Sequence, residues 1–338
     1  MTVCTLYLPI LYLLYIHNAA LIILSEHCHF PWMIRAENHK FRISGSFLHI
    51  VTECIMIYLN TAKCITHETV LIGGTIMNLF TFTPEQTRGC SVTAWLHQSR
   101  LSRPAIVICP GGGYDNLSRR EADPVAEPYF AAGYHVFILS YSVGAEAINL
   151  TPLCQLANTV AHIRKNCEQW LVHPDKIAVC GFSAGGHLAG SLGTLFNTPE
   201  FSNAFRQDAH IRPDAMVLAY PVITADEYAH SGSIEAVSGA KEGSEEYRWF
   251  DLAKHVDEDT PPTFLWHTAA DPAVPVENSL KFAMALSQAK VPFECHVFPT
   301  GGHGMSVCTK EVGSYNTYNA RWMNWSIQWL NTLFQFEN

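Results

Sequence analysis

KIAVCGFSAGGHLAGSL, at residues 176–192, is the most informative segment of this chain of 338 residues. The apolar run before Gly181 predicts a short buried strand, and the run of small residues that follows predicts a helix. Between them, residues 181–185 fit G-x-S-x-G. At such a strand–turn–helix junction the serine is exposed on a sharp turn, and the helix N-terminus adds partial positive charge beside it. We therefore interpret Ser183 as a nucleophile.

The chain around this segment alternates short apolar runs with longer helical stretches. Strands are predicted at residues 76–82, 91–97, 105–109, 135–140, 176–180, 215–219, 263–267 and 293–298. Helices are predicted at residues 120–132, 153–170, 185–196, 276–289 and 318–334. This alternation indicates an α/β fold, with a mostly parallel central sheet flanked by helices on both faces and an antiparallel hairpin at its start. We expect one domain over residues 71–338, with a lid or cap insertion at about residues 220–260.

Two further polar residues follow predicted strands downstream of Ser183. Asp271 comes after the strand at 263–267, and His303 lies in a Gly-flanked loop after the strand at 293–298. A serine becomes a strong nucleophile when a base removes its proton and a third group orients that base. Because parallel strands bring such loops to one edge of the sheet, we expect these three residues to form a catalytic triad. The other histidines are expected to be core or surface residues, among them His187, His267 and His296.

A triple-glycine loop follows the predicted strand at 105–109. Gly111, Gly112 and Gly113 lack side chains, so this loop can bring bare backbone N–H groups close to a carbonyl oxygen. Together with the N–H of Ala184, which follows the nucleophile, they are expected to form an oxyanion hole. The sequence does not indicate which of the three glycines donates.

Three residues near this loop and near the end of the strand at 135–140 are expected to line the substrate pocket together with the 220–260 insertion. They are Tyr114, Asn116 and Tyr141. The glycine spacings of nucleotide-binding loops are missing, and no spaced set of metal ligands is evident. We therefore expect neither a cofactor nor a metal.

The composition indicates a globular protein in a reducing compartment. The hydrophobic fraction is 48%, the charged fraction is 15% and the net charge is −9. These values exclude a disordered chain and argue against a nucleic-acid binder, which would carry a basic face. The cysteines number 11 and include no C-x-x-C pair, which favours free thiols and a cytoplasmic location.

Residues 1–70 differ from the rest of the chain. They carry four Lys/Arg and four Asp/Glu, and the first 25 residues carry no charge. A helix over Leu6–Leu24 would span roughly 28 Å, enough for a membrane tether, although no basic residue precedes it, as a signal peptide would require. The alternative is a disordered extension or sequence outside the natural reading frame, with Met77 as the start. The sequence leaves both interpretations open and does not indicate an oligomeric state.

Together, these motifs resemble those of the α/β-hydrolase superfamily, in particular esterases of the acetyl esterase and acetylxylan esterase type. The likeness covers residues 75–338 and rests on residues 110–114, 172–186, 271–275 and 301–305. The related hormone-sensitive-lipase type carries a histidine where this chain has Pro110. The resemblance implies a Ser183 nucleophile, a His303 base oriented by Asp271, no cofactor, and short acyl groups, often acetyl, on sugars or simple alcohols.

The expected function is therefore a serine carboxylesterase that hydrolyses short-chain acyl esters, acetylated carbohydrates such as xylan included, through an acyl-enzyme. Its expected partner is a small-molecule or carbohydrate ester rather than nucleic acid. A serine peptidase and a small-amide hydrolase of the formamidase kind share the catalytic layout and remain alternatives, because a fold does not set the leaving group.

Overall fold

The computed structural model describes residues 21–24, 33–36, 68–72, 75–205 and 210–337. The chain divides into two compact units, Met1–Lys63 and Cys64–Asn338. In the first unit, β1 (Leu21–Leu24) pairs antiparallel with β2 (Met33–Ala36). The remainder of the predicted tether Leu6–Leu24 lies outside the described residues. Within the described ranges, no helix is long and apolar enough to cross a membrane.

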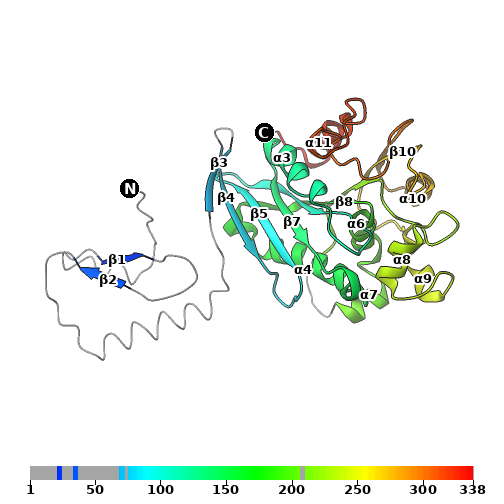
Figure 1. Ribbon diagram of the computed structural model, residues 1–338, viewed down its shortest axis with the longest axis horizontal. Helices are drawn as coiled ribbons and strands as arrows, with labels where there is room; N and C mark the ends of the chain where they lie inside the picture. The colour runs from blue at the N-terminus through cyan, green and yellow to red at the C-terminus, as the bar shows by residue number, and fades with distance from the viewer. Residues whose placement is uncertain (1–20, 25–32, 37–67, 73–74, 206–209, 338) are drawn as a thin grey trace. The chain divides into compact units, whose positions relative to one another are not determined.

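A single sheet forms the centre of the second unit (Figure 1). Its nine described strands lie in the order β11-β10-β9-β8-β6-β7-β5-β4-β3. The strands from β11 to β7 in this order are parallel, whereas β5, β4 and β3 are antiparallel to their neighbours. Their bounds are β3 Glu68–Ile72, β4 Thr75–Phe82, β5 Ser91–His97, β6 Arg103–Cys109, β7 His135–Ser140, β8 Val172–Phe182, β9 Ala215–Ala219, β10 Thr263–Thr268 and β11 Phe293–Phe298.

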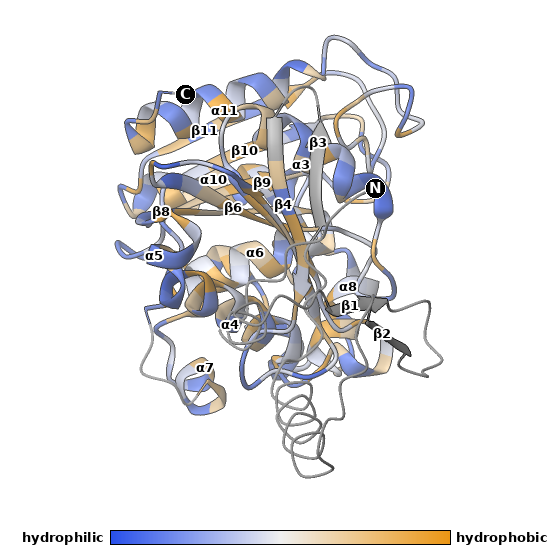
Figure 2. Ribbon diagram, turned by 90° about the vertical axis from the view of Figure 1, so that its left-hand side faces the viewer, coloured by the Kyte–Doolittle hydropathy of each residue, from blue (hydrophilic) through white to orange (hydrophobic). Residues whose placement is uncertain are grey.

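Two layers of helices cover the sheet, α4, α6 and α10 on one face and α3 and α11 on the other (Figures 1 and 2). The helix bounds are α3 Asp123–Ala131, α4 Thr151–Lys165, α5 Cys167–Trp170, α6 Ala184–Leu195, α7 Pro199–Ala204, α8 Ser231–Ser238, α9 Glu245–Trp249, α10 Glu277–Gln288 and α11 Arg321–Phe334. Short 3₁₀ turns occur at η1 Arg119–Glu121, η2 Gly144–Glu146 and η3 Leu252–Lys254.

Burial on both faces explains why the central strands are continuous apolar runs. In β8, Val179 packs with the α4 and α6 side of the core, and its neighbour Ala178 packs with the α3 and α11 side. Both residues are fully buried. Side chains alternate between the faces of a strand, so a strand covered on both faces has no solvent-facing positions and is mostly apolar.

The predicted fold class is confirmed, and the differences from the sequence-based expectation are local. The second unit begins at Cys64 rather than at residue 71, because β3 extends the sheet antiparallel to β4. The helix expected at 153–170 is two helices, because Asn166 leaves the helical conformation (φ −105°, ψ 14°) between α4 and α5. The segment expected as a lid, residues 220–260, contains α8 and α9.

The first turn of α6 packs tightly against the loop after β6. A Cβ atom at Gly185 would overlap the backbone carbonyl oxygens of Cys109 and Pro110, whereas one at Gly190, further along α6, would meet side-chain methyl groups only, the nearest that of Leu252 at 3.0 Å. We expect Gly185→Ala to lower the free energy of unfolding by about 2–3 kcal/mol, because backbone atoms must move. Gly190→Ala should change it by less than about 1 kcal/mol, because alanine also favours the helix. Urea denaturation measures both variants, and equal losses would contradict this account.

Candidate active site

Ser183 lies at the junction between β8 and α6, on a strained backbone. Its φ of 54° and ψ of −120° describe a backbone conformation that residues with side chains rarely adopt. Three backbone hydrogen bonds hold it there: its N–H donates to the carbonyl of Ala219 (3.0 Å), and its own carbonyl accepts from the N–H groups of His187 (3.0 Å) and Val222 (3.1 Å). The side chain is thereby presented at the carboxyl edge of the sheet.

The loops after β10 and β11 bring a carboxylate and an imidazole to Ser183. His303 Nε2 lies 2.8 Å from Ser183 Oγ, and His303 Nδ1 lies 2.7 Å from Asp271 Oδ2. With Nδ1–H donating to the carboxylate, Nε2 is left to accept the serine O–H. The structure therefore joins the three residues predicted from the sequence in one chain of hydrogen bonds.

The carboxylate of Asp271 is buried and is held by several donors. Oδ1 accepts the N–H groups of Ala273 (2.9 Å) and Val274 (3.0 Å). Burial by itself would raise the pKa of Asp271, but hydrogen bonds from His267 and His303 outweigh it and hold that pKa well below its usual range. Asp271 thus remains ionised beside the imidazole.

His267, expected from the sequence to be a core or surface residue, contacts the carboxylate of Asp271. It is fully buried at the end of β10, and its Nε2 lies 3.4 Å from Asp271 Oδ2 and 3.0 Å from the carbonyl oxygen of Val274. The hydroxyl of Ser279 lies 2.8 Å from its Nδ1. The only signal in the sequence was its position four residues before Asp271.

The glycine loop lies directly against the serine. A Cβ atom at Gly111 would come within 3.0 Å of Ser183 Cβ. The Gly111 N–H donates to the buried carboxylate of Glu121 (2.8 Å) and is therefore not available to a ligand. Among the described residues, no partner accepts the N–H groups of Gly112, Gly113 or Ala184.

Tyr114 and Tyr141, expected as walls of the substrate pocket, are buried beneath this loop instead. The exposed fraction is 0% for Tyr114 and 2% for Tyr141. The Tyr114 hydroxyl bonds to His187 Nδ1 (2.9 Å), and the Tyr141 hydroxyl donates to the carbonyl of Pro110 (2.5 Å). Each hydroxyl finds a buried partner, so both rings support the loop from below. Asn116 is exposed, and its expected contact with substrate stays a prediction.

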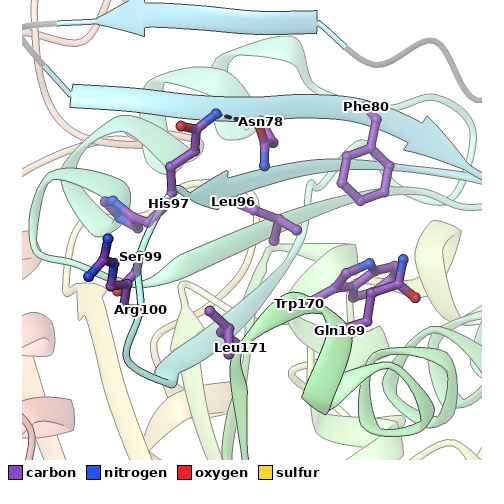
Figure 3. Close-up of a pocket in the computed structure, with 10 residues that line it drawn as sticks. Asn78, Phe80, Leu96, His97, Ser99, Arg100, Gln169, Trp170 and Leu171 are labelled. Carbon is purple, nitrogen blue, oxygen red and sulfur yellow. Dashed lines mark hydrogen bonds between the residues drawn. The ribbon is translucent and has the colours of Figure 1, made fainter. Parts of the chain in front are cut away.

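A surface cleft lies at the opposite edge of the sheet and contains none of these residues (Figure 3). It is bounded by the end of β5 and by the turn between α5 and β8, where the parallel strands begin. Its lining residues are Asn78, Phe80, Leu96, His97, Gln98, Ser99, Arg100, Gln169, Trp170 and Leu171. Within the described part of the chain, no group of three His, Cys, Asp or Glu side chains is placed to hold a metal ion.

The sequence pattern of the BD-FAE family matches residues 96–286, more than half of the chain. The chain belongs to the BD-FAE family. The matched range contains the glycine loop, Ser183 and Asp271, while His303 lies beyond its end. The resemblance to α/β-hydrolase esterases noted in the sequence is thereby confirmed.

Three relatives illustrate the family. Endo-1,4-beta-xylanase B of Butyrivibrio fibrisolvens is 38% identical over 224 residues, and an acetylxylan esterase of Xylanibacter ruminicola is 27% identical over 215 residues. These matches cover 65% and 61% of this chain but 35% and 42% of the relatives, so the chain spans between a third and half of their length. The crystal structure of an acetyl ester-xyloside bifunctional hydrolase from Caldicellulosiruptor lactoaceticus is similar with a TM-score of 0.67 at 34% identity, covering 73% of this chain and 89% of that chain.

The buried His187 beneath the loop gives a prediction about acid stability. Burial lowers the pKa of His187 to about 4, although a hydrogen bond to the carbonyl of Phe250 partly opposes this shift. An unfolded histidine takes up its proton near pH 6.5, so this residue stabilises the fold above that pH and the contribution is lost as pH falls toward 4. We expect the loss of unfolding free energy between pH 6.5 and 4 to be smaller by about 3 kcal/mol in His187→Gln than in the wild type. Parallel stability profiles, measured by urea unfolding, would contradict this assignment.

Proposed function

We propose that this protein is a serine carboxylesterase that hydrolyses short-chain acyl esters through a Ser183–His303–Asp271 triad and an acyl-enzyme. The observation that carries the proposal is the continuous chain of hydrogen bonds from Ser183 Oγ to Asp271, with distances of 2.8 and 2.7 Å. The order of the groups in this chain, serine, histidine and aspartate, suits base catalysis. The ionised carboxylate fixes the imidazole tautomer and stabilises the imidazolium that forms.

In the acylation step, His303 Nε2 takes the Ser183 proton while Oγ attacks the ester carbonyl carbon. The carbonyl oxygen becomes an oxyanion, which the N–H groups of Gly112, Gly113 and Ala184 are available to bind. The bond to the alcohol oxygen then breaks, and the alcohol leaves with the proton from His303. Ser183 is left as an acyl ester.

In the deacylation step, a water molecule takes the place of the alcohol. His303 accepts a proton from the water as its oxygen attacks the acyl carbon, and the same N–H groups bind the second oxyanion. The bond to Ser183 Oγ breaks, and the proton on His303 returns to the serine. The products are the carboxylic acid and the free enzyme.

The names of the relatives support acetyl esters of carbohydrates as the substrate class. One relative is an acetylxylan esterase, and one similar structure is an acetyl ester-xyloside hydrolase.

We also propose a cytoplasmic location. The support is that the seven cysteines within the described residues are all unpaired: Cys90, Cys109, Cys154, Cys167, Cys180, Cys295 and Cys308. Free thiols persist where the compartment is reducing.

Removing the serine hydroxyl tests the nucleophile. We expect Ser183→Ala to lower kcat for a chromogenic acetate ester by about 10⁴-fold or more, because no acyl-enzyme can form. The control is Ser191→Ala, which removes a buried hydroxyl from the same helix and should leave kcat within a few-fold of the wild type. Near-native turnover by Ser183→Ala, with folding verified by circular dichroism, would refute the assignment.

A substrate series tests the acyl group and the leaving group. We expect kcat/KM to fall at least about tenfold from acetate to octanoate esters of one chromogenic alcohol, because a pocket that fits an acetyl group excludes a longer chain. The corresponding acetanilide should react at least about 100-fold more slowly, since an amine is the poorer leaving group. Acetic acid release from acetylated xylan should be detectable. Equal or faster turnover of the anilide would instead favour the amide hydrolase.

A further inference from the structure

Glu121 is a buried carboxylate close to the glycine loop, and the mechanism above does not use it. It lies in η1 with an exposed fraction of 2%. Oε2 accepts the N–H of Gly111 (2.8 Å), and Oε1 accepts the hydroxyl of Tyr220 (2.7 Å). No Lys, Arg or His of the described residues forms an ion pair with it.

A buried carboxylate without a cation contributes little to stability by itself. Removing the charge from water costs several kcal/mol, and hydrogen bonds from neutral donors offset that cost only when both oxygens are satisfied. Here both oxygens accept a hydrogen bond, one from the loop and one from a tyrosine 99 residues further along the chain. The carboxylate therefore fixes these two donors relative to each other.

The bond to Glu121 and the hydrogen bonds within the loop together determine which N–H groups of the loop stay free. Each peptide unit of the loop is trans, so its N–H and its C=O point in opposite directions. The Gly111 carbonyl accepts from the N–H of Ser118 (2.9 Å), and the Gly112 carbonyl accepts from Asp115 (3.0 Å) and Asn116 (3.1 Å). The N–H groups of Gly112 and Gly113 thus point away from the turn at residues 115–118.

The same carboxylate is connected to the loop that carries the imidazole. The hydroxyl of Tyr220, while donating to Glu121, accepts the N–H of Ser306 (2.9 Å), three residues after His303. The Ser306 hydroxyl in turn donates to the carbonyl of Arg120. The Tyr220 ring also packs edge-on against the His303 ring, with the ring centres 5.1 Å apart.

We propose that Glu121 is a positioning residue for ester hydrolysis, which rests on the function proposed above. Its carboxylate anchors the Gly111 N–H, which leaves the Gly112 and Gly113 N–H groups for the oxyanion. Through Tyr220 and Ser306 it sets the distance between this oxyanion loop and the His303 loop. Glu121 acts through these groups and does not touch the substrate.

The test is Glu121→Gln, in which an amide NH₂ replaces one accepting oxygen and faces a donor. We expect kcat for a chromogenic acetate to fall about 10- to 100-fold with KM within about twofold, because a displaced loop weakens binding of the transition state and not of the substrate. Inhibition by a trifluoromethyl ketone, which forms a tetrahedral oxyanion on the serine, should weaken by a similar factor. A rise in KM with unchanged kcat would overturn the proposal.

Tyr220→Phe gives a second variant, because it keeps the ring against His303 and removes only the hydroxyl. We expect a smaller loss of kcat, and no additional loss when it is combined with Glu121→Gln, since residues of one network are not additive. Fully additive losses would contradict the connection through Tyr220.

The matched control is Asp214→Asn, at the amino end of the sheet. The Asp214 carboxylate also accepts a backbone N–H, that of Ile177 (2.8 Å), and pairs with Arg164 (2.9 Å). This variant should lose stability while keeping kcat within about twofold of the wild type.

Amide exchange separates this proposal from the proposed function. In the wild type, the Gly111 N–H should exchange slowly with solvent deuterium, and in Glu121→Gln at least tenfold faster, measured by NMR on the folded protein. A wild type without esterase activity would refute the proposed function, while the exchange rates would still test Glu121. Equal exchange of the Gly111 amide in both proteins would overturn the positioning proposal, whatever the activity.

Discussion

Ser183 has a φ of 54°, and it connects the last residue of β8 to the first residue of α6 with no linker between them. A turn this sharp requires close approach of backbone to backbone on both sides, which is why Gly181 and Gly185 lack room for a Cβ atom. The close contact between Gly185 and the backbone of Cys109 and Pro110 places the loop after β6 against the serine. The start of α6 also faces the serine. The strain at one residue thus sets the positions of the nucleophile, the oxyanion loop and the helix N-terminus.

The electrostatics of the site depend on two buried carboxylates with different partners. Asp271 is bonded to the imidazole and to backbone N–H groups, so its charge stabilises a cation that forms on His303. Glu121 is bonded, among the described residues, to two neutral donors, the Gly111 N–H and the Tyr220 hydroxyl. One carboxylate supports proton transfer, and the other supports the shape of the oxyanion loop.

The sequence predicts the sheet and the hydrogen-bonded trio Ser183, His303 and Asp271 because both rest on local patterns. Continuous apolar runs locate the strands, and the loops that follow β10 and β11 contain Asp271 and His303. The misplaced residues depend on distant partners. The Tyr114 hydroxyl bonds to His187, 73 residues away, and Glu121, which no sequence motif singles out, bonds to Tyr220, 99 residues away. Hydropathy cannot reveal such pairs, since it scores each residue alone.

The central claim is that Ser183 is an activated nucleophile, and covalent labelling tests it most directly. The wild-type chain would be treated with a fluorophosphonate, which reacts with serines that a neighbouring base activates, and then digested and mapped by mass spectrometry. If His303 activates Ser183, one phosphonyl group per chain attaches to Ser183, and none attaches after denaturation. A native protein that stays unlabelled, or that carries the adduct on another residue, would contradict it.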